Sequence, residues 1–179
     1  MADLDVLQDG DVRLRPVSLP GDIDVAWPWY QDVEMLALSQ RPGTAPLSRD
    51  RVARMYKYQA EHGDFYIIEV REERKERDGS FWRSIGDVML ARDTLPIVIG
   101  DPAFRRRGIG RRVLALLITR ARTLGWPTLQ AKEIWSFNEG SRRLFQSAGF
   151  VLAATGVDQG GQPYERYRLD LRQPENLEP

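Results

Sequence analysis

One segment in the second half of the chain constrains the fold more than any other. Residues 95–99, Leu-Pro-Ile-Val-Ile, form a short apolar run that is typical of a buried strand. A loop with two glycines, Gly108 and Gly110, follows, and apolar residues recur at helical spacing from Ile109 to Leu124. We therefore predict a right-handed strand–helix–strand crossover between parallel strands, from Leu95 to Trp135.

The rest of the chain supplies strands and helices in an order that indicates a mixed fold. Expected strands cover residues 12–15, 65–70, 81–91, 129–135, 150–154 and 164–171. Expected helices cover residues 22–38, interrupted by Pro28, then 49–62 and 139–148. The strands before and after residue 79 form a hairpin, with Gly86 at a bulge or a close backbone approach. We predict an α/β (α+β) fold of three α-β-α layers, with a mixed, largely antiparallel central sheet of about seven strands flanked by helices.

Length and composition indicate one soluble domain and exclude several kinds of chemistry. The 179 residues fit a single domain, with a core from about 11 to 171 and a polar tail at 172–179. The chain has no Cys and one His, which excludes disulfides, a Cys nucleophile, and thiolate or multi-His metal sites. Twenty-six basic residues balance 26 acidic ones, which argues against a nucleic-acid-binding protein. Because the chain has neither a membrane-spanning apolar run nor a signal peptide, we expect a cytoplasmic protein.

The loop between the apolar strand and the long helix has the features of an anion-binding site. Gly108 and Gly110 allow a tight turn and a close approach of the backbone to a ligand. The first N–H groups of the helix point outward and carry partial positive charge. Arginines add full charges, at Arg105, Arg106, Arg107 and Arg111. The loop lacks the Gly-Lys-Ser/Thr of a P-loop and the third glycine of a dinucleotide fingerprint, so we predict a different kind of phosphate or pyrophosphate site.

Two blocks of sequence resemble the acetyl-CoA-dependent N-acetyltransferase (GNAT) superfamily. The family's pyrophosphate pattern, Gln/Arg-x-x-Gly-x-Gly/Ala, fits Arg-Arg-Arg-Gly-Ile-Gly at residues 105–110, and residues 102–104 match the usual Pro-x-Tyr/Phe before it. The block from Asn138 to Phe150 resembles the family's Asn-x-x-Ala/Ser element, which continues into a helix and Gly-Phe. The resemblance extends from about residue 11 to 171. The first strand looks like that of the branch acting on protein N-termini or aminoglycosides.

The resemblance implies a site for acetyl-CoA and assigns residues to it. Backbone N–H groups from Arg105 to Gly110 would bind the CoA pyrophosphate, and residues 98–100 would offer backbone groups to the pantetheine arm. Asn138 would contact the pantetheine or an ordered water, and its position directly before a helix also makes it an N-cap candidate. The implied cofactor-binding residues are Val98, Ile99, Gly100, Arg105, Arg106, Arg107, Gly108, Ile109, Gly110, Arg111, Asn138 and Phe145.

The catalytic groups are less closely defined. Many relatives have a Tyr seven residues after the Asn, which protonates the leaving CoA thiolate, whereas this chain has Phe145, a candidate core residue. Water or another hydroxyl must replace that Tyr, or the thiolate leaves unaided, which a thiol pKa of about 8.5 permits. An acceptor amine is mostly protonated near neutral pH, so a carboxylate must help to remove a proton. We favour Glu133, in the strand that leads to Asn138, as this base, with Asp87 as the alternative and Asp93 as a third candidate.

Together these features predict an enzyme that transfers the acetyl group of acetyl-CoA to a primary amine by direct attack in a ternary complex. The acceptor is a small amine or a protein N-terminus, and a cationic acceptor would suit the acids Asp22, Asp24, Asp32 and Glu34. Candidates to line the acceptor pocket are Trp27, Trp29, Tyr30 and Trp135. The alternative function is a CoA-binding regulatory or sensor module without turnover, which only Phe145 favours. A homodimer is compatible with the sequence, and no metal, nucleic acid or membrane partner is expected.

Overall fold

The computed structural model describes residues 4–73 and 79–172, so the predicted polar tail lies almost wholly outside the described residues. The strands of the described part are β1 (Leu7–Asp9), β2 (Val12–Pro16), β3 (Asp64–Glu73), β4 (Ser80–Leu90), β5 (Ile97–Ile99), β6 (Thr128–Trp135), β7 (Val151–Val157) and β8 (Pro163–Asp170). The helices are α1 (Gly21–Ala26), η1 (Trp29–Gln31), α2 (Val33–Ser39), α3 (Arg49–His62), η2 (Pro102–Phe104), α4 (Ile109–Thr123) and α5 (Glu139–Ser147). All the predicted elements are present, whereas β1 and η2 were not predicted.

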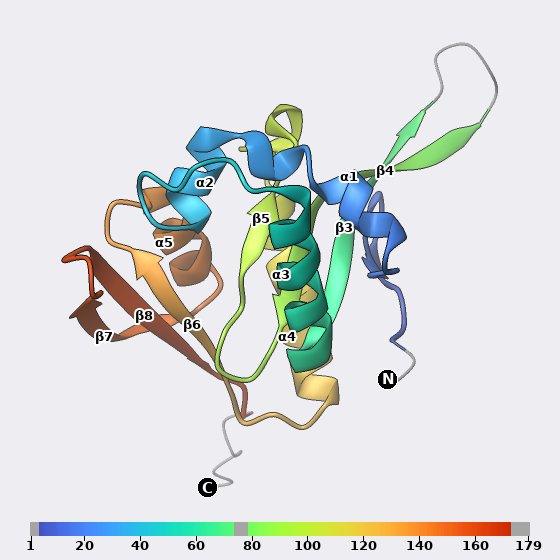
Figure 1. Ribbon diagram of the computed structural model, residues 1–179. Coiled ribbons are helices and arrows are strands. Elements are labelled where there is room, and N and C mark those ends of the chain that lie inside the picture. The colour runs from blue at the N-terminus through green and yellow to red at the C-terminus, as the bar shows by residue number, and fades with distance from the viewer. Residues whose placement is uncertain (1–3, 74–78, 173–179) are drawn as a thin grey trace, which may run out of the picture.

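The described strands form two antiparallel sheets that separate between β5 and β6 (Figure 1). The larger sheet has the order β1-β2-β3-β4-β5, and the smaller has the order β6-β8-β7. The predicted order of strand, helix and strand from Leu95 to Trp135 is present, but the predicted parallel pairing is not formed, because β5 pairs with β4 alone. β5 has only three residues and follows Pro96, which has no N–H to donate. The single sheet of about seven strands is therefore corrected to two sheets.

Helices cover both faces of the larger sheet, which confirms the predicted fold class (Figure 1). Successive side chains of a strand point to opposite faces, and Ile67 and Ile68 of β3 accordingly belong to different core clusters. Ile68 packs in the cluster that contains Leu117 of α4. Ile67 packs in the cluster that contains Tyr56 of α3. The larger sheet thus lies between α4 on one side and α1, α2 and α3 on the other.

The backbones of β4 and β5 approach each other closely at Gly86. The register of β3 against β4 shifts between Ile68 and Glu69, beside this glycine. A Cβ on Gly86 would lie 2.0 Å from the carbonyl oxygen of Val98 in β5. The predicted bulge and the predicted close approach are both confirmed, and only glycine fits this position without a backbone shift.

Replacement of Gly86 by Ala should therefore destabilise the protein. The added methyl group must displace a backbone carbonyl, and we expect a loss of about 1–3 kcal/mol in the free energy of unfolding, measured by urea denaturation. Gly21→Ala is the matched control, because a Cβ at Gly21 meets nothing within 4 Å. Equal midpoints for the two variants would contradict the close approach.

Candidate active site

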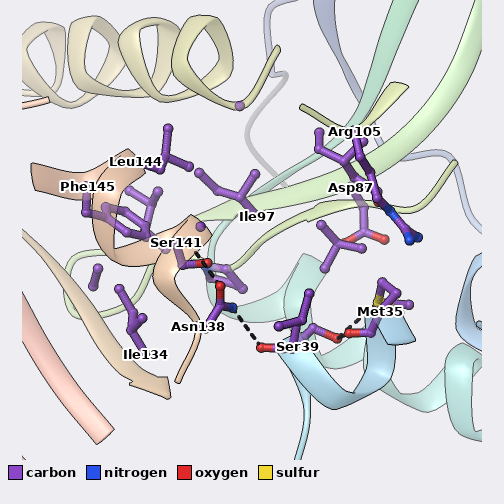
Figure 2. Close-up of a pocket in the computed structure, with 18 of the residues that line it drawn as sticks. Met35, Ser39, Asp87, Ile97, Arg105, Ile134, Asn138, Ser141, Leu144 and Phe145 are labelled. Atoms are coloured by element: carbon purple, nitrogen blue, oxygen red, sulfur yellow. Dashed lines mark hydrogen bonds between the residues drawn. The ribbon is translucent and has the colours of Figure 1, made fainter. Parts of the chain in front are cut away.

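A cavity of about 580 Å³ lies where the two sheets separate (Figure 2). β5, β6, α5 and the start of α4 form one part of its wall, and α2, α3 and Asp87 of β4 form another. The predicted cofactor-binding residues that line it are Val98, Ile99, Arg105, Arg106, Gly108, Ile109, Gly110, Arg111, Asn138 and Phe145. Of the predicted set, Gly100 and Arg107 do not line it. The structure therefore brings the two sequence blocks together around one cavity.

The first turn of α4 faces this cavity with an open backbone. Gly108 is the N-cap and has a φ of +78°, in the left-handed region that favours glycine, with open space where a Cβ would lie. The first N–H groups of a helix have no partner within the helix, and the helix dipole favours an anion beside them. Arg106 and Arg111 are exposed next to this turn and line the cavity. The loop therefore fits a phosphate or pyrophosphate group, as predicted from its sequence.

The side chain of Arg105 makes hydrogen bonds within the protein. Its guanidinium donates to the carbonyl oxygens of Ile99 at 2.9 Å and Gly100 at 2.8 Å. It also donates to Oδ2 of Asp32 at 2.7 Å, and Asp32 is the N-cap of α2. The predicted contribution of this guanidinium to the anion site is thereby corrected: Arg105 ties the end of β5 to α2. Its backbone N–H is also occupied, because it donates to the carbonyl oxygen of Pro102 at 3.2 Å.

Gly100 and Arg107, which do not line the cavity, make packing contacts beside it. A Cβ on Gly100 would lie 2.2 Å from Cγ of Trp29, so the indole of Trp29 occupies the space next to this glycine. The guanidinium carbon of Arg107 lies 5.0 Å from the centre of the Phe104 ring, within cation–π distance. These two residues support the loop, and a contact of their backbone with CoA stays a prediction.

α5 contributes two residues of the second sequence block. Oδ1 of Asn138 accepts from the backbone N–H of Ser141 at 3.0 Å, and its Nδ2 donates to the carbonyl oxygen of Leu38 at 3.2 Å (Figure 2). The N-cap role of Asn138 is confirmed, and the residue also joins α5 to α2. Phe145 is buried, with its ring edge-on to Phe150 at 5.1 Å between ring centres, which confirms it as a core residue.

Asp87 is a buried carboxylate held by two tyrosines at the edge of the cavity. Only 2% of the residue is exposed, and its Oδ2 accepts from the hydroxyls of Tyr30 at 2.9 Å and Tyr56 at 2.7 Å. Burial raises the pKa of Asp87 to about 6, although both hydrogen bonds oppose this shift. Burial also raises the pKa of both tyrosines, so their hydroxyls stay protonated and donate. A carboxylate with this pKa is mostly ionised at neutral pH and can accept a proton.

Glu133 also lines the cavity, from a bulge in β6. The register of β6 against β8 shifts between Ala131 and Ile134, and Glu133 has a φ of +57°, which is uncommon for a residue other than glycine. Its side chain is exposed and borders a second hollow of about 560 Å³ that adjoins the first. Asp93 lines neither hollow, and its ion pair with Lys132 at 2.5 Å lowers its pKa. Glu133 and Asp87 are thus the two predicted bases that lie at the cavity.

The acids expected to serve a cationic acceptor do not lie at the cavity. None of the four lines the cavity, and three form ion pairs with arginines: Asp22 with Arg15, Asp24 with Arg49, and Asp32 with Arg105. Among the aromatic candidates, Tyr30 lines the cavity and Trp135 borders the second hollow, whereas Trp27 and Trp29 line neither. Sequence reasoning missed four residues, because they lie in predicted helices far along the chain from both sequence blocks: Tyr56, Met35, Met55 and Gln59.

A comparison with protein-family models identifies the family to which the chain belongs. The model of the acetyltransferase (GNAT) domain matches residues 11–151. The chain belongs to the GNAT acetyltransferase family. This membership confirms the predicted family and an acetyltransferase domain with acetyl-CoA as its cosubstrate.

Solved structures share the GNAT fold at low sequence identity. Spermidine N-acetyltransferase from Vibrio cholerae, in complex with CoA and spermine, has a TM-score of 0.69 and 16% identity, over 91% of this chain and 97% of that one. A GNAT-family acetyltransferase from Bacillus anthracis has a TM-score of 0.71 and 9% identity, over 93% and 98%. RimL, a ribosomal L7/L12 α-N-protein acetyltransferase in complex with coenzyme A, has a TM-score of 0.71 and 13% identity, over 93% and 98%. A search of curated proteins found no match.

Two structural findings on this GNAT protein concern metal binding and membrane-spanning helices. Within residues 4–73 and 79–172, no three His, Cys, Asp or Glu side chains are grouped so that they could hold a metal ion. No helix in the same residues is long and apolar enough to cross a membrane.

The buried charge of Asp87 should make the stability of this GNAT protein depend on pH. Its folded pKa of about 6 lies above the unfolded value of 3.8, so the folded state binds more protons between these pH values. Its contribution to stability therefore falls as pH rises from about 4 to 6 and stays low above pH 6. We expect the unfolding free energy of Asp87→Asn, relative to the wild type, to rise over this window by on the order of 2–3 kcal/mol.

The measurement is urea denaturation at several pH values between 4 and 8. Asp93→Asn is the matched control: because Lys132 lowers the pKa of Asp93 below its ordinary value of 3.8, the difference between this variant and the wild type should stay nearly constant over this pH range. A pH-independent difference between Asp87→Asn and the wild type would contradict the raised pKa of Asp87.

Proposed function

We propose that this protein transfers the acetyl group of acetyl-CoA to a primary amine by direct attack in a ternary complex. The observation that carries the proposal is that the open N-terminus of α4 and the buried carboxylate of Asp87 line the same cavity. An anion site and a proton acceptor at one cavity allow both substrates to bind together. The chain has no Cys, so the acetyl group cannot be carried on a cysteine thiol of this protein.

Residues on three elements would hold acetyl-CoA. The backbone N–H groups from Arg106 to Gly110 would bind the pyrophosphate, with the exposed side chains of Arg106 and Arg111 adding charge. The edge of β5 that faces away from β4 would bind the pantetheine arm by backbone hydrogen bonds, since in the described chain β5 pairs only with β4. Asn138 lies between these groups and α2, where its second amide hydrogen remains for a ligand or water.

We propose Asp87 as the general base, with Glu133 as the alternative. Asp87 takes a proton from the acceptor ammonium, and the neutral amine then attacks the carbonyl carbon of the thioester. A C–N bond forms, the C–S bond breaks, and the electron pair leaves with the CoA sulfur. The attacking nitrogen then releases its second proton to solvent, which leaves a neutral amide. Phe145 cannot protonate this thiolate, so water takes that role or the thiolate leaves unaided. Asp87 is favoured because its burial and its two tyrosine partners fix its position, whereas Glu133 is exposed.

The acceptor is proposed to be a small amine or a protein N-terminus. Spermidine N-acetyltransferase and RimL, two proteins of the same fold, carry names that correspond to these two classes of acceptor. A regulatory module that binds CoA without turnover is the alternative, and the lack of a hydroxyl at Phe145 is the feature that favours it. We also propose, from the sequence, that the protein is soluble and cytoplasmic, and a homodimer is compatible with this function.

CoA should raise the melting temperature of the protein in proportion to the logarithm of its concentration, because it binds the folded state alone. Gly108→Asp should abolish this shift, since it puts a side chain and a negative charge at the proposed pyrophosphate site. Gly43→Asp is the matched control, because Gly43 has a similar φ of +81° with open space around it and lies outside the cavity lining. A wild-type melting curve that millimolar CoA leaves unchanged would contradict the CoA site.

Asp87→Asn should lower turnover by about 10²–10⁴-fold and leave the CoA-induced shift in melting temperature intact. For the wild type, kcat/KM should rise with pH through an apparent pKa near 6, because the carboxylate must be ionised to accept a proton. The titratable groups in contact with it are Tyr30 and Tyr56, which stay protonated in this range. The rising limb near pH 6 should be absent in Asp87→Asn.

Glu133→Gln tests the alternative base under the same conditions. With Asp87 as the base, Glu133→Gln should keep the rising limb near pH 6 and lose less than tenfold in turnover. A large loss of turnover in Glu133→Gln alone would identify Glu133 as the general base. If the wild type binds CoA and acetylates no amine in a broad library, the regulatory module is the correct function.

A further inference from the structure

The part of the cavity beyond Asp87 contains an amide side chain without a partner. Gln59 of α3 lines the cavity, and its Oε1 is buried with no hydrogen bond to any described residue. A buried polar atom left in this state costs about 1–3 kcal/mol, and such atoms are uncommon in folded proteins. A polar group of a bound ligand would remove this cost by bonding to the amide.

The position of Gln59 relative to Asp87 follows from the way α3 lies along β4. Tyr56, three residues before Gln59, donates its hydroxyl to Asp87. Gly63, four residues after Gln59, lies against Met89, where a Cβ would be 2.7 Å from Cγ of Met89. Asp87 and Met89 are two residues apart and share a face of β4. Along the direction of β4, Gln59 therefore lies between Asp87 and Met89. It is about 4.5 Å from Tyr56 along the helix axis.

The side of the cavity formed by α2 and α3 is largely apolar and carries no charge. Met55, one turn before Gln59 on α3, and Met35 of α2 both line it. The flexible, polarisable side chain of methionine adapts to alkyl chains of varied shape. The residues of α2 and α3 that line the cavity are all uncharged: Met35, Leu38, Ser39, Met55 and Gln59. This end of the cavity thus offers one carboxylate, an apolar wall and one neutral amide.

We propose that Gln59 determines acceptor specificity, and this inference rests on the proposed acetyltransferase function. The acceptor is a primary amine joined by a short alkyl spacer to a neutral hydrogen-bonding group, such as a hydroxyl or an amide. The amine lies at Asp87, and the neutral group bonds to the Gln59 amide, which can both donate and accept. A spacer of about three or four carbon atoms matches the helix rise between Tyr56, which bonds to Asp87, and Gln59. None of the residues of α2 and α3 that line the cavity carries a negative charge that could pair with a second ammonium group.

The test uses acetyl-CoA and three amines of matched length: 4-amino-1-butanol, n-butylamine and 1,4-diaminobutane. The wild type should use the amino alcohol about 10- to 100-fold better than butylamine in kcat/KM, because the alkyl amine leaves the buried amide unpaired. Gln59→Leu, which is similar in size and apolar, should reduce this ratio to about 1 or below. Gln59→Glu should shift the preference to the diamine, since it adds the missing negative charge.

Gln130→Leu is the matched control, because Gln130 lies on β6 outside the cavity lining, and it should keep the wild-type ratios. Gln59→Leu should also keep or raise the melting temperature without ligand, because it removes an unpartnered amide. Equal use of the three amines by the wild type, or unchanged ratios in Gln59→Leu, would overturn the role of Gln59 and leave the acetyltransferase function standing. Acetylation of none of the three amines would also overturn the inference. The proposed function itself fails only if no amine or peptide N-terminus of a broad library is acetylated while CoA binding is intact.

Discussion

The separation of β5 from β6 is the constraint on which the rest of the site depends. The close approach of Val98 to Gly86 holds β5 against β4, and Pro96 and Gly100 bracket its three residues. The opposite edge of β5 is left without a strand partner in the described chain, and the cavity opens there. Because α4 begins ten residues after β5 ends, the helix N-terminus and its partial positive charge lie at the same opening.

Residues of the two sequence blocks also fix the helix on the acceptor side of this opening. Arg105 binds the N-cap residue of α2, Asp32, and Asn138 binds the carbonyl oxygen of Leu38 near the other end of that helix. α2 has only seven residues, too few to be stable alone, so these tertiary bonds decide where it lies. The blocks that mark the cosubstrate site in the sequence therefore also shape the wall against which an acceptor would lie.

Three residues with energetically unfavourable features line the cavity. Asp87 carries a buried charge, Glu133 has a left-handed backbone, and Gln59 has a buried oxygen without a partner. Each costs free energy in the folded protein, and the surrounding sheet and helices compensate for it through their packing. Such costs persist at functional sites because ligand binding or proton transfer uses the groups that bear them.

The sequence by itself determined the order of the elements, the open loop at Gly108 and the cap at Asn138, because each depends on neighbours within a few residues. It also carried the blocks that identify the family. The tertiary structure alone decided that Tyr30 meets Asp87, 57 residues away, and that Arg105 turns its guanidinium to Asp32, 73 residues away. It also decided that β5 and β6 separate. Local spacing encodes periodicity and caps, whereas burial, ion pairing and strand partners depend on which distant segments pack together.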